Sequence, residues 1–165
     1  MRLLERGTRR LLAWLDALIN RVYGWRWNPI HQSGTVAVAM LLALTGTGLY
    51  LVFIYRVGDP AASVARLAAD PWLGRWLRSF HRYASDLFLI AGALHLLRMF
   101  AQSRSWGPRT LAWTSGLVLF GAGMVCAWTG FVMAWDTFGE RLARDGARML
   151  DVLPILSEPL SRIFA

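Results

Sequence analysis

Two histidines, His81 and His95, lie fourteen residues apart in an otherwise largely apolar stretch, FHRYASDLFLIAGALHLLRMF (80–100). Fourteen residues of α-helix advance about 21 Å and make nearly four turns, so both imidazoles are predicted to point the same way at two depths. An imidazole in hydrocarbon is costly without a partner, and ionisable residues within a membrane segment usually mark a functional site. Two histidines on one helix face favour a ligand role over an interhelical hydrogen bond.

Glycines repeat with the same spacing in two neighbouring segments. Gly34 and Gly48 are fourteen residues apart, as are Gly116 and Gly130. Close packing of two helices would explain any one such pair. A flat macrocycle of porphyrin size held beside each histidine would need backbone without side chains at the same two levels. The shared period in three segments therefore favours haem.

The composition indicates a membrane protein. The chain has 165 residues, of which 56% are hydrophobic and nine are tryptophan, and its mean hydropathy is positive. Crossing a bilayer takes about 20 apolar residues. Three windows meet this length, at 35–54, 79–100 and 111–135. The predicted fold class is an all-α membrane protein with three transmembrane helices.

The chain divides into three predicted parts. Residues 1–30 repeat leucines between arginines at helical spacing, which indicates an amphipathic helix in the membrane interface followed by an aromatic anchor. This N-terminal part is too charged for a cleavable signal peptide and is expected to be retained. Residues 31–135 form the haem-binding membrane domain. Residues 136–165 form an outer-face tail of one or two short amphipathic helices, interrupted by Pro154 and Pro159.

The charge distribution predicts the topology. The net charge is +8, and residues 1–30 carry six arginines against Glu5 and Asp16. The positive-inside rule then places the N-terminus inside and, after three spans, the C-terminus outside. Topology and anionic lipid explain the basic charge better than nucleic acid does, so no nucleic acid partner is expected. The single cysteine, Cys126, excludes an internal disulfide and a CxxC site.

Several motifs in order resemble the N-terminal part of cytochrome b, the membrane subunit of quinol-oxidising cytochrome bc complexes. The likeness runs from about Trp27 to about Pro154. The matching motifs are WN (27–28), LTGTGLYL (44–51), RSFH (78–81), HLLR (95–98), WTSG (113–116) and GFVMAW (130–135).

This resemblance implies two b-type haems. His81 would supply one axial ligand to the outer haem, usually the lower-potential one, and His95 one ligand to the inner haem. Gly34, Gly48, Gly116 and Gly130 would give the porphyrins room. Arg78 and Arg98 would pair with haem propionates, although snorkelling of these arginines to the interface remains an alternative. Ligation by two imidazoles leaves iron no open position, so the haems would carry electrons between a quinol site outside and a quinone site inside.

The chain departs from the family pattern in two places. Cytochromes b take the second axial ligands from a fourth helix, and no fourth span precedes Ala165. A partner polypeptide would bring that helix and its histidine pair, or the sequence is a fragment. The remaining histidine, His31, is expected to be interfacial. After the third span, Ala134–Asp136 replaces the family's Pro-Trp-Gly. The possible quinol-pocket residues that follow are Gly146, Met149 and Leu150, in a segment that would also suit a surface helix.

The resulting prediction is a split or truncated diheme cytochrome b of a respiratory chain in the inner (cytoplasmic) membrane. Such a subunit would work with iron–sulfur or c-type cytochrome subunits and would not be catalytic alone. One alternative is a haem-bearing membrane anchor of another quinone-linked oxidoreductase. A cofactor-free helical scaffold subunit is the other alternative.

Overall fold

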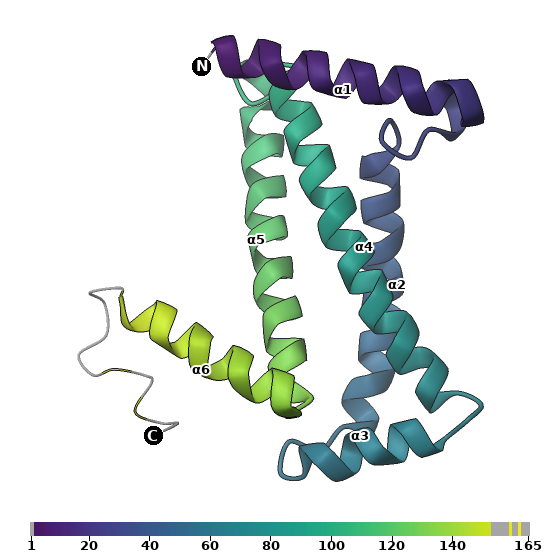
Figure 1. Cartoon of the computed structure of the whole chain (residues 1–165), viewed down its shortest axis with the longest axis vertical. Coiled ribbons are helices and arrows are strands. Elements are labelled where there is room, and N and C mark those ends of the chain that lie inside the picture. Colours follow the sequence, from purple (N-terminus) through teal and green to yellow (C-terminus); the bar gives the residue numbers. More distant parts are fainter. Residues whose placement is uncertain (1, 153–158, 160–161, 163–165) are drawn as a thin grey trace.

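The structure is a computed structural model that describes residues 2–152, 159 and 162, and the regular secondary structure of these residues is entirely helical. Figure 1 shows three long helices, α2 (Ser33–Ile54), α4 (Gly74–Ala101) and α5 (Thr110–Met133). Each of the three is long and apolar enough to cross a membrane. The prediction of an all-α fold with three membrane spans is therefore confirmed.

All three spans differ at their ends from the predicted windows, α2 only by beginning at Ser33. Helix α4 begins at Gly74, before the predicted Ser79, because the Asp70 carboxylate accepts hydrogen bonds from the backbone N–H groups of Trp72 (3.1 Å), Leu73 (3.4 Å) and Gly74 (3.0 Å). These hydrogen bonds, the one from Gly74 first, lower the pKa of Asp70. Helix α5 ends at Met133 because the backbone of Trp135 adopts a positive φ of 48°.

Helix α4 lies between α2 and α5 and contacts both, α2 more extensively. Where α4 contacts α5, an aromatic ring of each helix packs against a glycine of the other. A Cβ at Gly123 would be 2.5 Å from Phe88 Cε1, and a Cβ at Gly92 would be 3.0 Å from Phe120 Cδ2. Phe88 is buried as a result. Glycine at these two positions therefore allows α4 and α5 to pack closely.

The outward faces of the three long helices are apolar. Large side chains that are exposed on these faces include Val38, Leu42, Phe53, Leu111 and Val118. In a soluble protein, apolar surface of this extent would be unfavourable. The pattern fits helices that face lipid or the helices of other subunits.

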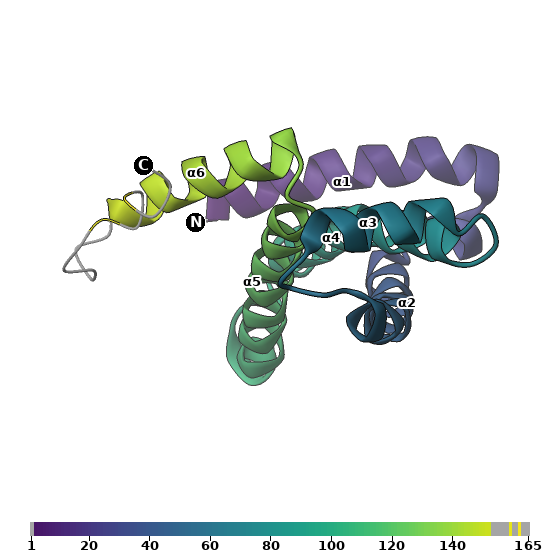
Figure 2. The ribbon, with the colours of Figure 1, turned by 90° about the horizontal axis from the view of Figure 1, so that it is seen from below.

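Three further helices lie across the ends of these three (Figure 2): α1 (Arg2–Tyr23), α3 (Pro60–Ala69) and α6 (Thr137–Asp151). Helix α1 crosses the end where α2 and α5 begin, while α3 and α6 lie at the opposite end (Figure 1). Following the predicted topology, we name these the inner and the outer end. Two 3₁₀ turns, Trp25–Trp27 and Gly107–Arg109, precede α2 and α5.

Helix α1 is amphipathic in the structure. Leu12 is buried, whereas Leu11, Trp14 and Leu18 are exposed. Exposed tryptophan and leucine on a helix that crosses the end of a membrane bundle suit the headgroup region. The location of α1 in the membrane interface stays a prediction.

Helix α3 lies between the first two predicted spans, where no helix was predicted from the sequence. Asp59 caps this helix, since its side chain accepts a hydrogen bond from the Ala62 N–H (3.3 Å), and Pro60 occupies the first helical position. Aspartate at the N-cap followed by proline is a recognised signature of a helix start. The signal was therefore present in the sequence.

Helix α6 is the one tail helix in the described residues. Asp136 caps it by accepting a hydrogen bond from the Gly139 N–H (2.8 Å). Its small residues Gly139, Ala143 and Ala147 are buried, and the helix contacts α5. Residues 153–158, including Pro154, lie outside the described part, so any second tail helix there stays a prediction.

Candidate functional site

His81 lies in the outer half of α4 and contacts α2. Its Nδ1 is 2.8 Å from Oγ1 of Thr47. A Cβ at the neighbouring Gly48 would be 3.3 Å from His81 Cε1, which is tighter than an ordinary contact. Helix α2 therefore approaches the imidazole through one polar contact and one glycine.

His95 lies nearer the inner end and contacts α2 at Gly34. A Cβ at Gly34 would be 2.6 Å from His95 Cε1 and 2.7 Å from Nδ1. Any side chain at position 34 would collide with the imidazole as it is placed here. Because α2 and α4 are antiparallel, Gly34 faces His95 and Gly48 faces His81, with the same spacing on both helices.

Two open grooves border His95, one on each side of α4. The larger has a volume of about 770 Å³, and α2 lines it with Gly34, Thr35, Val38, Ala39 and Leu42. The smaller has a volume of about 340 Å³, and α5 lines it with Ala112, Trp113 and Gly116. Grooves with mostly apolar linings and a few polar groups are typical of cofactor sites.

The spaced glycines of α5, Gly116 and Gly130, make looser contacts than Gly34 and Gly48 of α2. A Cβ at Gly116 would be 3.8 Å from Leu96 Cδ2, an ordinary distance, and Gly116 lines the smaller groove beside His95. A Cβ at Gly130 would meet no atom of the described residues within 4 Å. Among the described residues, Gly116 and Gly130 therefore leave more room beside them than Gly34 and Gly48, which face imidazoles.

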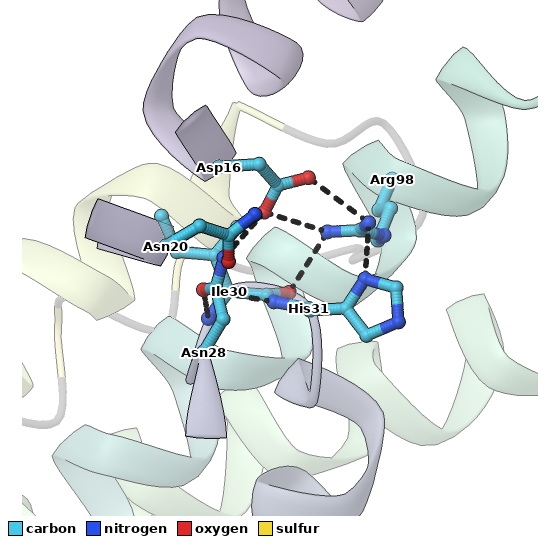
Figure 3. Close-up of polar contacts among 6 residues, drawn as sticks. All are labelled: Asp16, Asn20, Asn28, Ile30, His31 and Arg98. Atoms are coloured by element: carbon cyan, nitrogen blue, oxygen red, sulfur yellow. Dashed lines mark hydrogen bonds and ion pairs between the residues drawn. The ribbon is translucent and has the colours of Figure 1, made fainter. Parts of the chain in front are cut away.

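Arg98 forms a dense polar network at the inner end (Figure 3). Its guanidinium lies 3.0 Å from Asp16 Oδ2, donates to the Ile30 carbonyl (3.2 Å) and lies 2.8 Å from His31 Nδ1. The Arg98 side chain is only 12% exposed, so it is held firmly. Arg98, which was expected to pair with a haem propionate, therefore already pairs with an anion of this chain, the Asp16 carboxylate on α1.

Asn28 organises the same network from the turn before α2. This residue is fully buried, and its side-chain amide donates to Asp16 Oδ1 (3.0 Å) and Asn20 Oδ1 (2.9 Å). The side-chain oxygen of Asn28, Oδ1, accepts a hydrogen bond from the Ile30 N–H (2.9 Å). The WN motif at 27–28 thus has a structural role here, namely to join α1 to the start of α2.

The other candidate residues at the outer end are scattered. Arg78 is partly exposed and makes no hydrogen bond or ion pair with the described residues. Gly146 packs on α5, where a Cβ would collide with the Trp128 ring. Met149 is 76% and Leu150 is 38% exposed. None of Gly146, Met149 and Leu150 lines either groove beside His95, and their role in a quinol pocket stays a prediction.

Two site residues were not singled out from the sequence. Thr47 contacts His81, and no local pattern marks it beyond its place next to Gly48. Trp113 lines the smaller groove, and its Nε1–H is buried without a hydrogen-bond partner among the described residues. A buried donor without a partner is costly and often indicates an absent acceptor.

The residues around His95 fit a flat, acidic prosthetic group such as haem. The imidazole is placed between two grooves, glycine lies on both flanking helices, and Trp113 has an unsatisfied donor. Arg104 and Arg109 also line the smaller groove and supply positive charge there. Among the residues that the structure describes, no three His, Cys, Asp or Glu side chains gather to hold a metal ion.

Comparison with protein families supports the same reading. Residues 20–164, nearly the whole chain, match the family described as Cytochrome b/b6/petB. Membership implies binding of b-type haem, and members usually work in multisubunit membrane complexes. The three spans agree with a multi-pass membrane protein. The chain belongs to the cytochrome b family and is a membrane subunit that transfers electrons.

Proposed function

We propose that this chain is the haem-carrying N-terminal part of a diheme cytochrome b that moves electrons between a quinol site at the outer end and a quinone site at the inner end. One observation carries the proposal. His81 and His95 project from α4 at two levels, and each faces a glycine of α2. A helix pair that only needed to pack would not require an imidazole opposite each glycine.

The chain's own residues would hold the two haems, and each histidine would supply one axial ligand. Haem with two imidazole ligands transfers single electrons and has no open coordination position. Gly34 and Gly48 let the backbone of α2 approach the imidazoles, and Gly116 and Gly130 leave room along α5. The protein would thus set the positions and surroundings of two fixed redox groups.

Positive charge near each histidine would receive the haem propionates. At the outer end, Arg78 is available for this role. At the inner end, Arg98 would have to bind a propionate in addition to the Asp16 carboxylate, or release that carboxylate to bind the propionate. Arg104, Arg109 and the Trp113 Nε1–H already border the groove beside His95 and can bind a carboxylate without breaking that ion pair.

Partner subunits would complete the site. The second axial ligands would come from a fourth helix, either of a partner polypeptide or of a continuation of this chain, which the exposed apolar faces of α2 and α5 can receive. Iron–sulfur or c-type cytochrome subunits would accept electrons from quinol, with Gly146, Met149 and Leu150 near the quinol site. The arginine distribution supports an inner (cytoplasmic) membrane location with the N-terminus inside.

The experiment replaces one histidine at a time in the complex purified from native membranes. His81→Leu and His95→Leu should each remove one haem and leave the spectrum of the other, whereas His31→Gln, a control that removes the imidazole but keeps a hydrogen-bonding side chain beside Arg98, should keep both. Reduced-minus-oxidised spectra and haem extraction measure the haem content, and mass spectrometry of the subunits identifies the chain that brings the fourth helix.

The possible results separate the alternatives. Two haems per copy, with a co-purifying chain that carries another spaced histidine pair, would support the diheme cytochrome b. Unchanged haem content in His95→Leu would disprove the ligand assignment. Absence of haem from the intact complex would favour the cofactor-free scaffold.

A further inference from the structure

Thr47 on α2 is placed between a backbone carbonyl and an imidazole. Its Oγ1 lies 2.7 Å from the Ala43 carbonyl oxygen and 2.8 Å from His81 Nδ1. The residue is only 9% exposed, so water competes little for either contact. The Leu44 carbonyl oxygen is farther away, at 3.3 Å, so the hydroxyl must divide its hydrogen-bonding capacity between carbonyl oxygens of its own helix, Ala43 the nearer, and the imidazole.

The two contacts together determine which nitrogen of His81 carries the proton. A hydroxyl has one hydrogen, and a carbonyl oxygen can only accept. The hydrogen of Thr47 is therefore donated to Ala43, within the turn of α2. At His81 the hydroxyl oxygen must then accept, which requires a hydrogen on Nδ1. In a neutral imidazole the other nitrogen, Nε2, is then left with a free lone pair.

We propose that Thr47 is a positioning residue that holds His81 with its proton on Nδ1 and presents Nε2 to the haem iron, and that this hydrogen bond lowers the reduction potential of that haem. The inference rests on the proposed ligand role of His81. A hydrogen bond from the distal ring nitrogen orients a ligating histidine and raises its basicity. A more basic ligand favours ferric over ferrous iron.

His95 differs from His81 in this respect. It makes no hydrogen bond with the described residues, and the residue of α2 that faces it most closely, Gly34, has no side chain to donate or accept one. One histidine thus has a hydrogen-bonding side chain on α2 and the other does not, although the two histidines and the two facing glycines are both fourteen residues apart. The inequality gives a physical reason for a lower potential at the outer haem than at the inner one.

The test uses four variants of the intact complex. Thr47→Val and Thr47→Ala remove the hydroxyl, and Thr47→Ser keeps it. Thr45→Val is the matched control, because Thr45 makes the same kind of bond to the Leu41 carbonyl (2.9 Å) and is exposed. Potentiometric titration of both haems is the main measurement, and the electron paramagnetic resonance spectrum of the oxidised haems reports ligand orientation.

Loss of the hydroxyl should weaken the preference of the outer haem for the ferric state about tenfold. For a one-electron couple this corresponds to a rise of about 59 mV in its potential. The spectrum of the outer haem should also change, while the inner haem stays as it was. Thr47→Ser and Thr45→Val should match the unmodified complex. Loss of the outer haem from both Thr47→Val and Thr47→Ala, with full haem in Thr47→Ser, would support the same role.

The contrary results separate this inference from the proposed function. If Thr47→Val and Thr47→Ala keep the potential and spectrum of the outer haem, the positioning role is wrong, even if His81→Leu removes that haem. If His81→Leu keeps both haems, the ligand assignment itself is wrong, and the role of Thr47 falls with it.

Discussion

The close contact between Gly34 and His95 leads to a graded prediction for glycine-to-alanine variants. A Cβ at Gly34 would lie 2.6 Å from His95 Cε1, and one at Gly48 would lie 3.3 Å from His81 Cε1. Carbon atoms in contact are normally about 3.5–4.0 Å apart. Gly34→Ala thus creates an overlap of about 1 Å with the ring, and Gly48→Ala only a few tenths of an ångström.

The magnitude follows from the cost of overpacking. An extra methyl group in a well-packed site typically costs about 1–3 kcal/mol. If the imidazole of His95 moves away to relieve the overlap, it leaves the position needed for ligation. Since about 1.4 kcal/mol corresponds to a factor of ten, we expect Gly34→Ala to weaken inner-haem binding about 5- to 150-fold. Gly48→Ala should weaken outer-haem binding by a smaller factor.

The assay measures the haem content of the purified complex by extraction, with each haem identified in a redox titration. Gly46→Ala is the control, because it lies on the same helix and a Cβ there would meet nothing within 4 Å. Full occupancy of the inner haem in Gly34→Ala would refute the reasoning. Equal loss in Gly46→Ala would also refute it, since the effect would then come from the helix as a whole.

Three further predictions concern the helices that surround the site. Asp16→Asn should leave the nearly buried Arg98 without its anion and loosen the docking of α1 by about 1–3 kcal/mol. Faster amide hydrogen exchange in α1 would reveal this, and unchanged exchange would show that the ion pair does not dock this helix. The hydrogen bonds that lower the pKa of Asp70 mean that its carboxylate stabilises the start of α4. This stabilisation should be complete above the unfolded-state pKa of about 4 and should disappear as the pH falls from there through the lowered folded-state pKa. Exchange of the amides of residues 72–74 measured against pH tests it, and a profile identical in Asp70→Ala would contradict it. Gly146→Ala should push α6 away from Trp128 and speed tryptic cleavage in α6, and an unchanged cleavage rate would show that the contact is dispensable.

The spacing of Thr47 from His81 illustrates why part of the site was not predicted. The two residues lie 34 positions apart in the sequence, and their contact depends on the rotation and register of α2 against α4. The same is true of Asp16 and Arg98, which are 82 positions apart. From the sequence, Arg98 was expected to face a propionate, because its spacing from His95 was visible and its partner on α1 was not.

The sequence by itself determined the three spans, the common face of His81 and His95, and the matching levels of the glycine pairs. These features follow from chain length, hydrophobicity and the 3.6-residue period of the helix, which are local properties. The tertiary structure alone decided which glycines touch an imidazole, which anion Arg98 binds and which histidine receives a hydrogen bond. Those outcomes depend on how side chains from distant segments pack between helices, and no local period encodes that packing.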